Sequence, residues 1–114
     1  MHELSIISNV VDTLKEFFKD NPVTKVYSVT LSVGTVSGIV PHYLTDAWRW
    51  FTKNEELFKE SKLKIEPILA VTTCLDCGEE YDTIKYAKIC PHCHSEHTVL
   101  KQGNELLIKE IEAE

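Results

Sequence analysis

All four cysteines of this 114-residue chain fall into two pairs with the same spacing. Cys74 and Cys77 form the first Cys-x-x-Cys pair, and Cys90 and Cys93 form the second. Two intervening residues let both sulfurs of a pair turn toward one ion, and two such pairs supply the four thiolates of a tetrahedral zinc site. Because four sulfurs leave no coordination position open for water, the spacing predicts a structural zinc site rather than a catalytic one.

Two other functions could use the same four cysteines. The stretch Cys-Leu-Asp-Cys-Gly followed by Tyr81 is similar to the iron site of rubredoxin, although the interval between the pairs is short and a rubredoxin's aromatic core is missing. A nucleic-acid-binding zinc ribbon is the other alternative, but acidic residues outnumber basic ones around the cysteines and would repel phosphate. We rank both below a structural zinc site, and a redox-active set of thiols without metal ranks lowest.

Three histidines, His92, His94 and His97, surround the second cysteine pair. The simplest interpretation is that they are solvated or donate hydrogen bonds to the zinc-bound thiolates. The alternative is that one of them contributes to a second metal site. In that case His94 and His97 are the candidates for an extra nickel ligand.

The first three residues, Met1-His2-Glu3, have a specific metal chemistry. A free α-amino group, the backbone nitrogen of residue 2 and the imidazole of His2 can wrap one metal ion in fused small chelate rings. Such nitrogen-rich sets suit Ni(II) or Cu(II), which favour square-planar or tetragonal coordination. A residue as large as His2 should also leave Met1 unprocessed, so that the chelating geometry is expected to survive in the mature protein.

The composition restricts the class of protein. With 43% hydrophobic and 26% charged residues, a chain of this length can bury one core but not two independent ones. Its 12 basic and 18 acidic residues leave a formal net charge of −6, which argues against a nucleic-acid or anionic-membrane binder. The sequence has neither an apolar run near the ~20 residues of a membrane-spanning helix nor a signal peptide. We therefore expect a cytoplasmic protein, whose cysteines bind metal rather than form disulfides.

The elements that must position these residues follow from periodicity. The first twenty residues have the spacing of an amphipathic helix, which Asn21-Pro22 ends because proline disfavours helical geometry in the residue before it. From Tyr27 to Val33, apolar and hydroxyl residues alternate as in a half-buried strand. After a turn at 34–38, Pro41 fits the first position of a second helix. The expected apolar face of the first helix is Leu4, Ile7, Val10, Val11, Leu14, Phe17 and Phe18. That of the second is Leu44, Ala47, Trp48 and Phe51.

Strands are also expected near the second half of the chain. Segments 63–65 and 68–71 read as strands interrupted at Pro67, and 106–111 reads as a final strand. The expected fold class is α+β, with two helices packed on a small mixed or antiparallel sheet. A four-cysteine, zinc-ribbon-like module is inserted between the later strands, and we expect its two ends to emerge close together.

The predicted domains are an α/β nickel-binding domain, 1–71 together with 100–114, and a zinc-binding module, 72–99. The module contains few large aliphatic residues, so burial alone offsets little of its ordering entropy. A structural zinc ion can supply about 10–16 kcal/mol of apparent folding free energy. We therefore expect the module to depend on its metal.

With these motifs, the whole chain resembles the HypA family, the nickel metallochaperones of hydrogenase maturation. Each matching segment is only moderately specific, but a terminal Met-His-Glu combined with two later Cys-x-x-Cys pairs in so short a chain is highly specific. The matching segments are Met1-His2-Glu3-Leu4, Leu31–Gly34, Ser37–Pro41 with Leu44, the two cysteine pairs, and Gly103–Glu112.

The resemblance implies a function. HypA-like proteins bind Ni(II) at the N-terminus, hold zinc in the four-cysteine module, and work with the GTPase HypB to load nickel into the hydrogenase large-subunit precursor. In some organisms they also support urease maturation. Carried over by position, His2 is the primary nickel ligand, helped by the Met1 amine, nearby backbone nitrogens and Glu3, while the four cysteines bind zinc. The protein is then not an enzyme.

Two features bear on this resemblance. Where the family commonly has a glutamate after the helix-starting proline, this chain has His42, so a role attributed to that acidic position is in doubt here. The chain also contains no GxxxxGK[ST] phosphate loop, which is consistent with nucleotide hydrolysis by a partner. The competing interpretation is a zinc-ribbon protein-interaction module without any nickel role.

Overall fold

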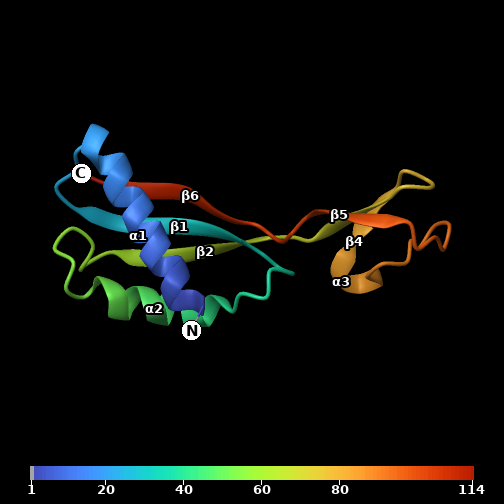
Figure 1. The fold of residues 1–114 in the computed structure, drawn as a ribbon, viewed down its shortest axis with the longest axis horizontal. Coiled ribbons are helices and arrows are strands. Elements are labelled where there is room, and N and C mark those ends of the chain that lie inside the picture. The colour runs from blue at the N-terminus through green and yellow to red at the C-terminus, as the bar shows by residue number, and fades with distance from the viewer. Residues whose placement is uncertain (1) are drawn as a thin grey trace. The chain divides into compact units, whose positions relative to one another are not determined.

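The computed structural model describes the chain from His2 to Glu114, and its side chains from Glu3 onward. It contains three helices and two three-stranded sheets, with strand orders β2-β1-β6 and β4-β3-β5 (Figure 1). This confirms the α+β class expected from the sequence. The elements are α1 (His2–Asp20), β1 (Val26–Gly34), α2 (Pro41–Thr52), β2 (Lys62–Ile68), β3 (Val71–Cys74), β4 (Glu80–Asp82), α3 (Thr83–Tyr86), β5 (Thr98–Gln102) and β6 (Leu106–Ala113).

The chain divides into two compact units. The first comprises the residues up to Ser32 together with Ile39–Glu66 and Leu107–Glu114. The second comprises Val33–Gly38 and Pro67–Leu106, and it contains all four cysteines. Among the described residues, none of the helices combines the length and the apolar character needed to cross a membrane.

Helix α1 buries one face in the core of the first unit. Ile7 and Val11 are fully buried, and Leu14 is nearly so. The helix ends where Asn21 donates from both its backbone N–H and its side-chain amide to the Phe17 carbonyl oxygen. The Phe17 side chain, which the sequence pattern assigned to the apolar face, is 53% exposed. The apolar stripe of α1 is therefore narrower than expected, because a helix resting on one surface buries only about a third of its circumference.

An aromatic cluster completes this core. Trp48 of α2 is 2% exposed, and its ring meets Phe58 edge-on with centroids 5.8 Å apart. Its Nε1–H donates to Ser61 Oγ at 3.0 Å, so the polar end of the buried indole has a partner. Phe58 is fully buried although it lies in the loop between α2 and β2. Periodicity could not identify it, because a loop residue has no regular neighbours.

Polar residues of the central strand β1 are buried beneath ion pairs. Ser28 is 4% exposed, and its hydroxyl donates to Glu112 Oε1 of β6 at 2.7 Å. Lys64 Nζ of β2 donates to the same oxygen at 3.0 Å. The hydrogen bond from Ser28 and the nearby Lys64 ammonium lower the pKa of Glu112. The predicted half-buried alternation is therefore wrong in part: Tyr27 is exposed while Ser28 and Thr30 are buried, because long charged side chains from both neighbouring strands cover the polar face.

In the second unit, β3 is the central strand and pairs antiparallel with both β4 and β5. Val71 pairs with Gln102 and Cys74 with Thr98, so the two ends of the cysteine-containing segment lie side by side, as expected. Strand β2 does not stop at Pro67 as the sequence suggested but continues to Ile68. Proline is tolerated there because β2 is an edge strand, whose outer N–H groups need no strand partner.

Two glycines of the second unit lie in contact. A Cβ on Gly34 would fall 1.9 Å from the Gly103 carbonyl oxygen. Gly103 has φ +116°, and a Cβ there would fall 2.5 Å from Cα of Ala70. Gly38 differs, since it has φ +79° but open space around it. Glycine is therefore required at 34 by close packing and at 38 by backbone conformation alone.

We expect Gly34→Ala to destabilise the second unit by about 2 kcal/mol or more, because a backbone carbonyl must move to admit the methyl group. Gly38→Ala is the matched control and should cost about 1 kcal/mol, the strain of a left-handed alanine. The protection of the β3 and β5 amides from hydrogen exchange measures the loss of stability in each variant. Equal protection in the two variants would contradict this account of the packing.

Candidate metal centre

The four cysteine sulfurs converge in the second unit. Cys74 ends β3, Cys77 lies in the turn after it, and Cys90 and Cys93 lie between α3 and β5. All four Sγ atoms lie within 4.8 Å of one another, with 3.5 Å between those of Cys74 and Cys93 and 3.6 Å between those of Cys77 and Cys90. Zn–S bonds of about 2.3 Å place tetrahedral sulfurs about 3.8 Å apart, whereas a disulfide bond is about 2.05 Å long. The donor set therefore fits a four-coordinate thiophilic metal ion.

The first Cys-x-x-Cys turn is closed by backbone hydrogen bonds. The Cys74 N–H donates to the Glu79 carbonyl oxygen at 2.9 Å, and the Gly78 N–H donates to the Cys74 carbonyl oxygen at 2.9 Å. Gly78 has φ +78°, the left-handed conformation that glycine adopts without steric cost. This is the role that its position after the second cysteine of the pair suggested.

The second turn repeats the first. The Cys90 N–H donates to the Ser95 carbonyl oxygen at 3.0 Å, and the His94 N–H donates to the Cys90 carbonyl oxygen at 2.9 Å. His94 occupies the place of the glycine and has φ +62°. From the sequence, we interpret His94 as a solvated residue, a hydrogen-bond donor to the thiolates or an extra metal ligand, and its backbone role is not predicted. The available signal was its position directly after the second cysteine, as for Gly78, because histidine is among the residues enriched in the left-handed region.

The electrostatics of the cluster favour binding of a cation. Nearby backbone N–H groups, that of Cys77 above all, lower the pKa of the Cys74 thiol to about 7. The pKa of Cys77 is raised to about 12: the Glu79 N–H lowers it, but desolvation and the sulfur of Cys90 outweigh that effect. Without a metal, ionisation of one thiol thus opposes ionisation of another. A divalent cation at the centre removes this opposition, because all four sulfurs can then bind as thiolates.

Two of the four sulfurs form most of a small core. Cys74 and Cys90 are fully buried and cluster with Tyr81, which is 7% exposed. The Tyr81 hydroxyl donates to the Ala87 carbonyl oxygen at 2.8 Å, and its ring meets Tyr86 edge-on. Cys77 and Cys93 are exposed. The core around the cysteines is thus built from the metal-binding residues themselves, in line with the shortage of large aliphatic residues in this segment.

The histidines near the second cysteine pair do not join the cluster. The imidazole of His97 lies 3.5 Å from an Asp76 carboxylate oxygen, and its backbone N–H donates to Ser95 Oγ at 2.9 Å. His92 donates its backbone N–H to Cys90 Sγ at 3.4 Å, and its side chain is exposed. Within the described part of the chain, no histidine lies in a group of three or more potential metal ligands. A nickel role for His94 or His97 stays a prediction.

The N-terminal candidates are only partly described. Met1 and the side chain of His2 lie outside the described residues. Glu3 lies in the first turn of α1, where a carboxylate interacts favourably with the positive end of the helix dipole. His42 lies in the first turn of α2, with Nε2 3.2 Å from an Asp46 carboxylate oxygen on the same helix and both side chains largely exposed.

Comparison with known proteins covers the full length of the chain. Residues 1–113 match the family model described as "Hydrogenase/urease nickel incorporation, metallochaperone, hypA". A hydrogenase maturation factor HypA from Shewanella oneidensis is 34% identical over 114 residues, which cover 100% of this chain and 96% of that protein. A hydrogenase maturation factor HypA from Aquifex aeolicus is 31% identical over 120 residues, which cover 100% of this chain and 98% of that protein.

Two solved structures of HypA proteins have the same fold as this chain. A solution structure of HypA protein superposes with a TM-score of 0.75 at 26% identity, covering 99% of this chain and 96% of that one. The solution structure of the nickel metallochaperone HypA from Helicobacter pylori has the same fold, with a TM-score of 0.72 at 24% identity and coverage of 97% and 96%. The chain therefore belongs to the HypA family of nickel metallochaperones for hydrogenase maturation.

Proposed function

We propose that this protein binds Ni(II) at its N-terminus and delivers it, together with a HypB-like GTPase, to the precursor of the [NiFe]-hydrogenase large subunit. The observation that supports this most is the family match over residues 1–113, which includes the initial Met-His-Glu. The protein is a carrier rather than an enzyme, because nickel is its cargo and no bond of a substrate changes.

We assign the two metal ions to separate sites, because they prefer different ligands and geometries. The four thiolates already complete a tetrahedral shell, and such a closed shell suits an ion that stays in place. Zn(II) is the ion we assign there, with a structural role. A cargo ion must be released, and an N-terminal site of nitrogen ligands is open to an acceptor protein. Such ligands also match the tetragonal preference of Ni(II).

The nickel ligands we assign are the Met1 amine, the imidazole and the backbone nitrogen of His2, and Glu3. Helix α1 begins at His2, so no earlier carbonyl of that helix can accept the His2 N–H. His94 or His97 is the candidate for an additional ligand. The nickel-binding domain then comprises 1–71 with 100–114, and the zinc module comprises 72–99.

The remaining parts of the proposal concern the cellular setting. The sequence lacks a phosphate-binding GxxxxGK[ST] loop, so nucleotide hydrolysis falls to the partner GTPase. Urease maturation proteins are a second destination for the nickel, in keeping with the family's description. We place the protein in the cytoplasm, where thiols stay reduced and available to zinc.

Nickel titration of the wild type and three variants tests the N-terminal site. Calorimetry with zinc-saturated protein should show one equivalent of Ni(II) bound by the wild type. His2→Ala, and a variant with residues added before Met1, should bind about tenfold more weakly or worse, because each removes a ligand. His42→Ala is the matched control, since that imidazole faces Asp46 on its own helix. If all four proteins bind alike, the N-terminal site is wrong.

Removal of one thiolate tests the structural role of zinc. We expect Cys90→Ala, or a strong chelator added to wild type, to remove the metal and abolish amide protection in β3 and β5. A metal ion that contributes about 10 kcal/mol or more cannot be replaced by so small a core. The helical circular dichroism of α1 and α2 should remain, because the first unit has its own core.

Two controls accompany this test. Leu75→Ala changes an exposed residue inside the first turn, at 67% exposure, and should keep stoichiometric zinc. His2→Ala should also keep its zinc, since the cysteine site is separate. Loss of zinc in His2→Ala would refute the two-site arrangement, and retained β3 protection in metal-free Cys90→Ala would refute the structural role.

A further inference from the structure

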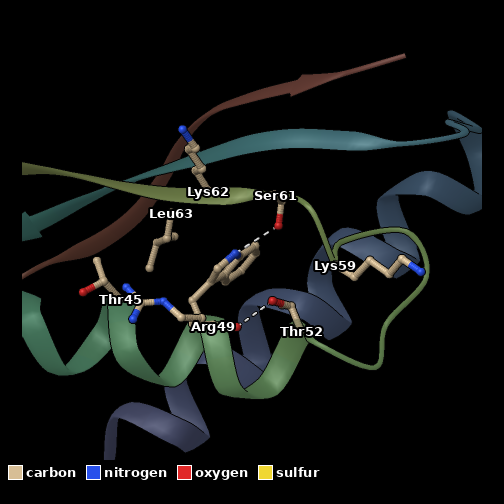
Figure 2. Close-up of a pocket in the computed structure, with 8 residues that line it drawn as sticks. Thr45, Arg49, Thr52, Lys59, Ser61, Lys62 and Leu63 are labelled. Atoms are coloured by element: carbon tan, nitrogen blue, oxygen red, sulfur yellow. Dashed lines mark hydrogen bonds between the residues drawn. The ribbon is translucent and has the colours of Figure 1, made fainter.

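A pocket of about 520 Å³ lies between α2 and the start of β2, entirely within the first unit (Figure 2). Trp48 contributes to the lining of this pocket. Its indole Nε1–H donates to Ser61 Oγ, and its backbone carbonyl oxygen accepts a hydrogen bond from Thr52 Oγ1 at 2.6 Å. The polar groups around Trp48 are therefore satisfied within the protein. The pocket lining comprises Thr45, Trp48, Arg49, Thr52, Lys59, Ser61, Lys62 and Leu63.

The charge of this pocket is opposite to that of the chain. Its lining holds three cations and no carboxylate, although the chain has 18 acidic against 12 basic residues. Among the described side chains, Arg49 and Lys62 form no ion pair, whereas nearby Lys64 is paired with Glu112 and Lys59 lies 3.7 Å from Glu56. Arg49 and Lys62 thus keep their donors available for an anion from outside.

The arrangement of the cations favours an extended ligand over a compact one. Figure 2 shows Arg49 on α2, whereas the Lys62 side chain extends from β2 away from α2, and Lys59 lies on the loop at one end. A single phosphate needs donors that converge on one point. Cations on different sides of β2 instead suit carboxylates on both faces of an extended peptide, whose side chains alternate between its two faces.

A strand edge borders the same pocket. In the order β2-β1-β6, β2 is an outer strand, and Lys62 and Leu63 of the lining belong to it. Outer strands recruit extended peptides through main-chain hydrogen bonds, while side-chain pockets select the sequence. Lysines on such an edge discourage pairing with a second positively charged edge, and they attract an acidic one.

We propose that the β2 edge and the adjoining Arg49–Lys62 pocket form a docking site for an acidic, extended segment of a partner protein, which adds a strand to the sheet. The segment places one carboxylate against Arg49 on the α2 side of the sheet, another against Lys62 on the opposite side, and an apolar side chain against Leu63. This site is independent of the nickel and zinc sites, and it stands whether or not the N-terminus binds nickel.

The test uses full-length, zinc-loaded protein and a fluorescent octapeptide with the repeat Thr-Thr-Glu-Glu, which places carboxylates on both faces of an added strand. Fluorescence anisotropy should detect binding that weakens with added salt, and amide chemical shifts should change at 61–65. A matching threonine–glutamine peptide should bind about tenfold more weakly or worse, because it lacks the charges. A proline–glutamate peptide with the same spacing, Pro-Pro-Glu-Glu, should also bind more weakly, because it lacks half of the N–H donors a strand needs.

Protein variants complete the test. Arg49→Glu combined with Lys62→Glu should weaken binding of the threonine–glutamate peptide about tenfold or more, because both attractions become repulsions. Lys53→Glu makes the same kind of charge change at an exposed lysine outside the pocket and should alter binding less than twofold. If the reversed pair misfolds by circular dichroism, Arg49→Gln with Lys62→Gln replaces it, with the same direction expected.

Four results would overturn the proposal. The reversed pair could bind the peptide as wild type does, or the chemical shifts could change only outside 61–65. The proline–glutamate peptide could bind as tightly as the threonine–glutamate peptide, which would exclude strand addition. Inorganic phosphate could bind in the pocket while the peptide does not, which would make it a compact anion site.

Discussion

Mutual repulsion among four sulfur atoms within 4.8 Å of one another is the constraint on which the second unit depends. Backbone N–H groups stabilise the thiolate of Cys74, yet the pKa of Cys77 is raised, because the lowering effect of the Glu79 N–H is outweighed by desolvation and the nearby sulfurs of Cys90 and Cys74. Only a cation lets all four ionise together, and each Cys-x-x-Cys turn is already shaped to hold two sulfurs toward one point. We therefore expect a bound metal ion to be the centre of the small core and not an addition to a finished fold.

The two units differ in what stabilises them. In the first, Trp48, Phe58 and the inner face of α1 provide ordinary apolar burial, and surface ion pairs such as Lys64–Glu112 close the polar side of the sheet. In the second, Cys74, Cys90 and Tyr81 form the core around the metal site. One chain thus combines a unit built on apolar packing with a unit whose small core is built from the potential metal ligands themselves.

Several features of the fold were accessible from local pattern. The helix at the N-terminus, the strand β1 and the helix that begins at Pro41 were predicted correctly, because each has a regular apolar period and a clear terminating or initiating residue. Strand β4, helix α3 and strand β5 were not predicted, because they are short and have no regular buried apolar face: α3 and β5 contain no buried residue. The break assigned to Pro67 was wrong, because the strand's position at the edge of the sheet removes the penalty for proline.

The sequence by itself determined the metal chemistry and the family, because ligand type and spacing are properties of neighbouring residues. Cys74, Cys77, Cys90 and Cys93 needed no tertiary information to be recognised as one set. Tertiary structure alone decided that Gly34 must lack a side chain, that His94 takes the left-handed position of the second turn, and that Arg49 and Lys62 share a pocket. Each of these depends on a contact or a backbone angle set by residues distant in the chain, which no local periodicity encodes.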